Sequence, residues 1–199
     1  MKWFKSCLTA VIIGFFAVPS VQADDVDDIN KLVKKKVTII FDLLGQKDAD
    51  VNERNKKIVA ELNEIIDFNL TAYLSLGKKN WKKLSKKQRS EFKKIFKQYI
   101  NNYIVEKIAL YNNQKIEIGA VNIIKKNKAT LDVGFQSGGE QYQIIFKLRK
   151  NKKKKWLVWG LVIEGVSVIK TFQTQFSGVL KKDSLDVLLE KLRNSAPKS

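Results

Sequence analysis

Few residues of this sequence could carry out acid–base or nucleophilic chemistry. The chain contains no histidine, and Cys7 is its only cysteine. Without these residues, neither a Ser-His-Asp nor a Cys-His nucleophile can be assembled, and a zinc site with the usual His and Cys ligands cannot form. The sequence also lacks a glycine-rich phosphate-binding loop. We therefore expect no enzyme, with no catalytic residue, no cofactor and no metal.

Carboxylates remain as candidate functional groups. Four aspartates stand close together near the start, namely Asp24, Asp25, Asp27 and Asp28. They could bind calcium weakly, but their spacing matches no EF-hand loop, which favours a solvated acidic segment. Glu164 follows an apolar strand and is the best candidate for a buried acid. Because no partner acid or base is visible, we favour a structural role, bonding the amides of Gly165 and Val166, over the weaker enzymatic alternative of an acid pair.

Lysine and arginine are in large excess. The chain has 38 basic and 20 acidic residues, which gives a formal net charge of +18. Lysines gather at residues 34–36 and 152–155 and on one face of a helix predicted from residue 86. Such a surface attracts nucleic acid, an anionic membrane or an acidic protein. Aromatic residues of the same helix share an apolar stripe and should point inward, so we expect no nucleic acid as partner.

The N-terminal segment has the parts of a secretory signal peptide. Two lysines make its start positive, residues 8–18 are apolar and uncharged, and residues 21–23 supply small side chains at a cleavage site. We predict a signal peptide over residues 1–23, export of the chain, and one domain over residues 24–199. The alternative is an uncleaved anchor, which the shortness of the apolar run disfavours.

Apolar residues recur at helical spacing in the first half of the chain. These stripes predict three helices, at about residues 29–44, 53–66 and 68–76. Asp67 is suited to cap the third helix, and Gly77 to end it. Ser85 and Gln88 form a capping box, in which each side chain bonds an amide at the helix start. The long helix that they begin should continue to Tyr111.

The apolar period then changes to two. Alternating residues and apolar runs predict strands around residues 116–118, 131–135, 142–148 and 156–163. Polar segments at residues 125–128, 137–140 and 151–155 predict hairpin turns. Two closing helices follow, at about residues 169–180 and 185–192. The order predicts an α+β fold in which N-terminal helices and one long helix pack on a curved antiparallel sheet of about four strands, with an apolar cavity between the layers.

Bulky apolar residues on the predicted inner faces are the candidate wall of that cavity. An ordinary solid core is the simpler explanation for any one of them, whereas a helical layer over a curved sheet can leave an apolar cavity. The predicted wall consists of Phe41, Phe68, Leu74, Trp81, Phe92, Phe96, Tyr99, Tyr103, Tyr111, Phe146, Leu148, Trp156, Val158, Val166, Val168 and Phe172.

Two segments carry a recognisable pattern. The first contains Leu76-Gly77-Lys78-Lys79-Asn80-Trp81, then Gln88, Phe92, Phe96 and Tyr103. The second, which is more specific, contains Trp156-Leu157-Val158, Ile163-Glu164-Gly165-Val166-Ser167-Val168, Phe172 and Gln175-Phe176. Together they resemble the MlaC family of toluene-tolerance periplasmic phospholipid-binding proteins, over nearly the whole chain after residue 23. Two positions depart from the family pattern: Gly160 replaces a usual acid, and Gln173 replaces a frequent arginine.

The resemblance implies a periplasmic carrier that holds phospholipid acyl chains against the predicted wall and does no chemistry on them. It also implies that a monomeric carrier exchanges this cargo between an outer-membrane lipoprotein complex and an inner-membrane ABC transporter with an MCE-domain protein. This exchange would maintain outer-membrane lipid asymmetry. The alternative is a basic periplasmic binding or scaffolding domain with a solid core, which docks an acidic envelope partner. That alternative predicts no cavity and a strong salt dependence of binding.

Overall fold

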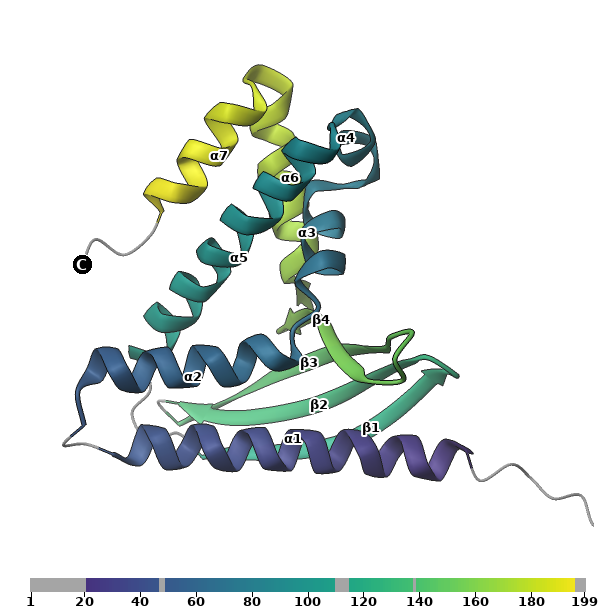
Figure 1. Cartoon of the computed structure of the whole chain (residues 1–199). Helices are drawn as coiled ribbons and strands as arrows, with labels where there is room; N and C mark the ends of the chain where they lie inside the picture. Colours follow the sequence, from purple (N-terminus) through teal and green to yellow (C-terminus); the bar gives the residue numbers. More distant parts are fainter. Residues whose placement is uncertain (1–20, 47–48, 110–114, 138, 196–199) are drawn as a thin grey trace, which may run out of the picture.

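A computed structural model describes residues 21–46, 49–109, 115–137 and 139–195 of the chain. The elements follow in the order α1 (Val21–Gly45), α2 (Val51–Ile65), α3 (Phe68–Leu76), α4 (Lys78–Lys83), α5 (Lys86–Ala109), β1 (Ile116–Lys125), β2 (Lys128–Ser137), β3 (Glu140–Lys150), β4 (Trp156–Ile163), β5 (Val166–Ser167), α6 (Val168–Lys182) and α7 (Leu185–Asn194). The predicted α+β class is confirmed (Figure 1). The sequence pattern did not indicate the short α4 and β5. Most of the predicted signal peptide and Tyr111 lie outside the described residues.

The helix ends follow the predicted capping chemistry. The Asp67 carboxylate accepts a hydrogen bond from the Leu70 amide at 3.0 Å, at the start of α3. Gly77 ends that helix with φ 81°, a left-handed conformation that glycine adopts without a steric penalty. At the start of α5, Ser85 and Gln88 exchange hydrogen bonds of 2.9 and 3.2 Å, which confirms the capping box. These local contacts fix where the helices begin and end.

The sheet is an antiparallel meander with strand order β1-β2-β3-β4-β5. Because neighbours in sequence are also neighbours in the sheet, hairpin turns are enough to connect β1 to β4. Irregularities interrupt the register of β1 with β2 and of β3 with β4. Such irregularities bend a strand and increase its twist. The sheet curves accordingly, and α1 and α2 run along it (Figure 1).

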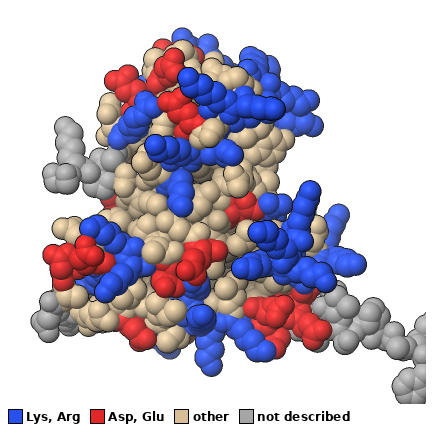
Figure 2. All heavy atoms as spheres, viewed as in Figure 1, with Lys and Arg blue, Asp and Glu red and all other residues tan. Residues whose placement is uncertain are grey.

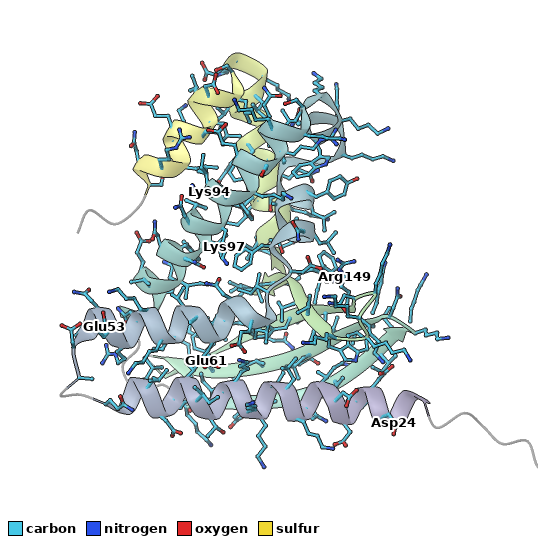
Figure 3. The ribbon with its side chains drawn as sticks, in the orientation of Figure 1. Asp24, Glu53, Glu61, Lys94, Lys97 and Arg149 are labelled. Atoms are coloured by element: carbon cyan, nitrogen blue, oxygen red, sulfur yellow. The ribbon has the colours of Figure 1, made fainter. Side chains whose placement is uncertain are left out.

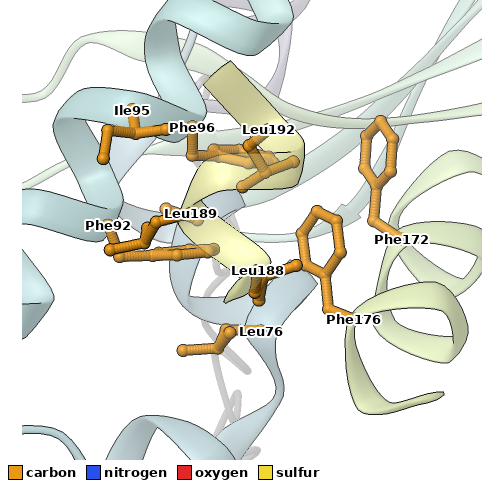
Figure 4. Packing of buried hydrophobic residues seen from close by; sticks show 10 residues of the cluster. Leu76, Phe92, Ile95, Phe96, Phe172, Phe176, Leu188, Leu189 and Leu192 are labelled. Atoms are coloured by element: carbon orange, nitrogen blue, oxygen red, sulfur yellow. The ribbon is translucent and has the colours of Figure 1, made fainter. Parts of the chain in front are cut away.

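Helices α3 to α7 pack together beside the sheet and are here called the helical head (Figure 1). Their buried core consists of Ala72, Leu76, Phe92, Ile95, Phe96, Phe172, Phe176, Leu188, Leu189 and Leu192 (Figure 4). A second core lies between α1 and the sheet and consists of Ile29, Ala129, Leu131, Val133, Leu148 and Trp156. The fold therefore has two hydrophobic cores. Among the described residues, no helix is long and apolar enough to cross a membrane.

Candidate functional site

The sheet turns one apolar face, here called the inner face, toward α1. Paired residues of antiparallel strands point to the same side of a sheet. The register therefore builds three apolar rows, Ile123–Ala129–Leu148–Val158, Val121–Leu131–Phe146–Leu161 and Ile118–Val133–Ile144–Ile163–Val166. Ile29, Leu32 and Val33 of α1 pack against this face. The inner face is thus an extended apolar surface that spans all five strands.

The cover on the inner face differs between its two ends. Near the β1–β2 and β3–β4 turns, Leu148 and Trp156 are buried together with Ile29 of α1. At the opposite end, here called the far end, Ile118 is 41% exposed and Val166 is 61% exposed. A solid core would bury such residues, so the far end is apolar surface that the described part of the chain leaves uncovered.

The far end continues into a pair of aromatic residues. Phe135 and Tyr142 are cross-strand partners whose rings stack with centroids 5.0 Å apart. Both are only half-buried. In Figure 1 the C-terminal end of α1, the N-terminal end of α2 and the C-terminal end of α5 lie at this end of the molecule. Phe41 on α1 is half-buried there, and Tyr103 near the end of α5 is 38% exposed.

Several predicted wall residues lie instead in the helical head. Phe92 and Phe96 stack with ring centroids 5.7 Å apart, and Phe172 meets Phe96 edge to face at 5.9 Å. Trp81 and Tyr99 pack around these rings (Figure 4 shows the phenylalanines). Burial raises the pKa of the Tyr99 hydroxyl. Rings at these distances fill the space between the helices, so they form a solid core.

The structure therefore divides the predicted wall. On the inner face it places Phe146, Leu148, Trp156, Val158 and Val166. Phe41 lies on α1, near its C-terminal end. In the helical head it places Trp81, Phe92, Phe96, Tyr99, Val168 and Phe172. Phe68 and Leu74 lie on α3, and Tyr103 lies on α5. Sequence analysis missed other inner-face residues, namely Ile118, Leu131, Val133, Ile144, Leu161 and Ile163. The alternation of apolar residues in each strand indicated which residues share one side of that strand. The register between strands then shows that these sides form one common face.

Two buried aspartates attach the N-terminal helices to β3. Asp25 of α1 is paired with Lys150 and also accepts a hydrogen bond from the Trp156 indole at 3.4 Å. Asp67, between α2 and α3, pairs with Arg149 at 2.5 Å. Figure 3 labels Arg149 at the junction of the sheet and the helical head. Both aspartates are buried, so losing either partner would leave a charge away from water.

Lys36 joins α1 to α2. It is buried, and its ammonium group lies 2.7 Å from Glu61 and 2.5 Å from Glu64 (Figure 3 labels Glu61). Burial lowers the pKa of Lys36, but hydrogen bonds to both glutamates outweigh it and the net pKa is raised. The hydrogen bond from Lys36 and its positive charge lower the pKa of Glu64. This ion pair network holds the two helices together where they pass the sheet.

Glu164 has a structural role, but the prediction that it is buried was wrong. The residue is exposed and adopts φ 46° in the turn after β4. Its carboxylate accepts a hydrogen bond from the Gln143 amide at 2.5 Å, and its own amide donates to the Gln143 carbonyl at 3.1 Å. The partner is therefore β3, and not the amides of Gly165 and Val166. Among the described residues, no three acidic side chains gather to hold a metal ion.

Some buried polar atoms on α2 and α5 lack a partner within the described part of the chain. They are Nε of Arg54 and Oδ1 of Asn55, Asn63 and Asn101. Asn55 and Ile58 share the buried side of α2. Buried polar atoms without a partner are uncommon in folded proteins and call for water or a ligand.

Comparisons with known proteins agree on one family. A family model described as MlaC protein matches residues 27–194. The Intermembrane phospholipid transport system binding protein MlaC of Haemophilus influenzae is 27% identical over 209 residues, which cover 98% of this chain and 93% of the relative. A phospholipid-binding protein from Ralstonia solanacearum, solved in complex with a phospholipid, has a similar fold, with a TM-score of 0.68 and 17% identity. That match covers 85% of this chain and 95% of the other.

Proposed function

Because this chain belongs to the MlaC family, we propose that it is a periplasmic phospholipid carrier. The acyl chains would lie against the inner face of the sheet. The observation that carries this proposal is the incomplete cover of that face, which leaves Ile118 and Val166 exposed and the Phe135–Tyr142 pair half-buried. The names of the similar proteins from H. influenzae and R. solanacearum support phospholipid as the cargo.

The free energy of moving acyl chains explains why such a face would be needed. Exposing one methylene group to water costs about 0.8 kcal/mol, so two chains with roughly 30 methylenes cost on the order of 20 kcal/mol. A carrier must therefore cover nearly all of both chains. Without cargo, an empty cavity of that size would lose packing contacts, so α1 and α2 would settle closer to the sheet.

The lipid-contacting residues that we propose are those of the inner face and of the helices opposite. On the sheet they include Ile118, Ile144, Phe146, Val158 and Leu161, and on α1 they include Phe41. Tyr103 extends this set toward the end of α5. Tyr111, which lies outside the described residues, stays in the proposed set on the basis of its sequence position. The amide oxygens of Asn55, Asn63 and Asn101, which have no partner among the described residues, would offer acceptors to the hydroxyl or ammonium group of a lipid head group.

The proposed carrier does no chemistry on its cargo. We propose that it takes part in phospholipid exchange between an outer-membrane lipoprotein complex and an inner-membrane ABC transporter with an MCE-domain protein. Its basic surface would favour anionic partners. The predicted signal peptide over residues 1–23 would bring the chain to the periplasm.

Native mass spectrometry of the purified chain, combined with lipid extraction, tests the carrier proposal. We expect bound phospholipid that is released only on denaturation. Ile144→Arg should remove this lipid, because it places a charge on the inner face. Ile145→Arg is the matched control: Ile145 is also half-buried, but it pairs with Val162 on the other face of the sheet. Unchanged lipid in a folded Ile144→Arg variant would contradict the assignment.

The basic scaffolding domain remains a second candidate because the helical head has a solid core. For that function the inner face would close without cargo, and binding to an acidic partner would weaken with salt. A clean protein mass that is unchanged after incubation with liposomes would favour this second candidate.

A further inference from the structure

We propose that two hairpin turns at one end of the sheet form a docking surface for an anionic membrane. This surface, here called the lysine turns, comprises Lys125, Lys126 and Lys128 around the β1–β2 turn and Lys152, Lys153, Lys154 and Lys155 in the β3–β4 turn. The inference goes beyond the proposed cargo, since it concerns how the protein meets a bilayer surface.

The two turns form one surface. The Lys150 amide donates a hydrogen bond to the Asn127 carbonyl at 3.0 Å, which joins the β3–β4 hairpin to the β1–β2 turn. Lys128 also pairs with Arg149 in the sheet register. All seven lysines are exposed, and none makes an ion pair with another described residue. Both turns lie at the right in Figure 1, and Figure 2 shows basic side chains gathered on that side of the molecule.

The β3–β4 turn holds its lysines in a fixed arrangement. The Asn151 side chain accepts hydrogen bonds from the Lys153 and Lys155 amides at 2.9 and 3.0 Å. The Asn151 amide also donates to the Lys155 carbonyl at 2.8 Å. Lys154 adopts φ 58°, a left-handed conformation that a glycine would adopt without strain. A lysine at this position keeps a charge at the expense of backbone strain, which points to a use for the charge.

An apolar side chain stands among these charges. Ile124 is 58% exposed and precedes Lys125 directly. An exposed apolar residue next to lysines is typical of surfaces that bind the interface of an anionic bilayer. The surface contains lysines and no arginine. Arginine predominates where a carboxylate of a protein partner is bound by two hydrogen bonds from one guanidinium group, whereas lysine acts as a flexible point charge. The lysine turns therefore suit the diffuse negative charge of a bilayer better than the carboxylates of an acidic protein.

Acidic residues below the turns limit the contact to one side. Asp24, Asp27 and Asp28 are exposed at the start of α1, and Figure 3 labels Asp24 there. Asp27 is partly neutralised by Lys31 at 2.6 Å. An anionic bilayer would be repelled from this part of α1 and attracted to the turns, which orients the protein on the membrane.

Co-sedimentation with vesicles tests the docking surface. Vesicles of phosphatidylcholine alone are compared with vesicles of phosphatidylcholine and phosphatidylglycerol at low ionic strength. We expect binding only to the anionic vesicles. The combined variant Lys152→Gln, Lys153→Gln, Lys154→Gln and Lys155→Gln should bind at least roughly tenfold more weakly. The matched control changes four exposed lysines of the helical head, Lys78, Lys79, Lys82 and Lys83, to Gln, and should retain binding within about twofold.

Two single variants separate docking from folding. Lys154→Gly relieves the backbone strain of a lysine in the left-handed conformation, so the Tm of this variant should rise. The loss of one positive charge should weaken vesicle binding about fivefold. At high salt, screening weakens the attraction of the lysines to the vesicle, so the remaining binding should depend on the apolar contact of Ile124. Ile124→Ser should therefore remove the vesicle binding that is left at high salt. A Lys154→Gly variant that is more stable and binds equally well would overturn the role of this lysine.

Other outcomes would overturn the membrane assignment as a whole. These are equal binding to neutral vesicles, equal weakening in the helical head control, or absence of binding to anionic vesicles at low salt. The last result, with a basic surface intact, would indicate an acidic protein as the partner. Native mass spectrometry of the same samples keeps the two proposals apart. Bound lipid with no vesicle binding refutes only the docking surface, and vesicle binding with no bound lipid refutes only the carrier.

Discussion

Phe96 illustrates how one aromatic residue can be conspicuous in sequence and still serve the fold. It has 0% exposed surface and contacts the rings of Phe92, Phe172 and Phe176. Phe135 is a ring of the same size on the far end of the inner face, where it is only half-buried. The two phenylalanines therefore differ in what surrounds them, although their side chains are identical.

This difference predicts a difference in stability. Phe96→Ala should lower the free energy of unfolding by about 3–5 kcal/mol, because it opens a cavity among packed rings. Phe135→Ala should lower it by less than about 1.5 kcal/mol, because little buried surface is lost. Urea unfolding of the two variants, after removal of lipid, measures both values. Similar losses for the two would mean that the far end is packed as tightly as the helical head.

At the scale of elements, ion pairs attach α1 to the sheet and to α2, and apolar residues of α1 pack on the inner face. Asp25 attaches the start of α1 to β3, and Lys36 joins α1 to Glu61 and Glu64 of α2. These attachments lie away from the far end. We expect any separation of these helices from the sheet to begin at the far end, because the ion pairs hold them nearer the turns.

The Lys36 network predicts how stability changes with pH. The pKa of Glu64 is lowered in the folded state, so its contribution is present above the ordinary carboxyl value of 4.5 and is lost as pH falls through the folded pKa. The pKa of Lys36 is raised, so its contribution is present below 10.5 and is lost as pH rises above it. Urea unfolding should show a loss of stability on acidification that is smaller in Lys36→Met. An equal loss in both proteins would exclude this network as its source.

Local features were predictable from sequence, whereas long-range arrangement was not. Asp67, Ser85 and Gln88 cap helices through contacts a few residues apart, so their roles follow from the sequence alone. The apolar stripe on α5 predicts that one side of the helix is buried, but it does not identify the elements that bury it. In the structure this stripe packs against other helices of the helical head. Glu164 was misplaced because the apolar run of β4 ends just before it, where the turn faces solvent.

At the scale of the whole molecule, the helical head and the sheet with α1 and α2 have different packing. The head is a solid cluster of rings and leucines. The sheet has an inner face that is buried at one end and half-covered at the other. One unit therefore supplies rigidity, and the other supplies the apolar surface for which cargo is proposed.

Hydrogen exchange should detect this division. Loading with phospholipid should slow amide exchange in α1, α2 and β1 to β4, since cargo would fill the space between them and disfavour their local opening. Exchange in the buried parts of α5 and α6 should change little. Mass-spectrometric exchange of loaded and delipidated protein measures both regions. Equal slowing throughout would indicate that lipid stabilises the chain as a single unit.

The core of the helical head is assembled from segments on both sides of the strands in the sequence. Leu76, Phe92 and Phe96 precede the strands, whereas Phe172 and Leu188 follow them. During synthesis from the N-terminus, the first set of rings is made long before the second set exists. Closure of this core must therefore await translation of α6 and α7, so a nascent chain that has reached only β5 cannot complete it.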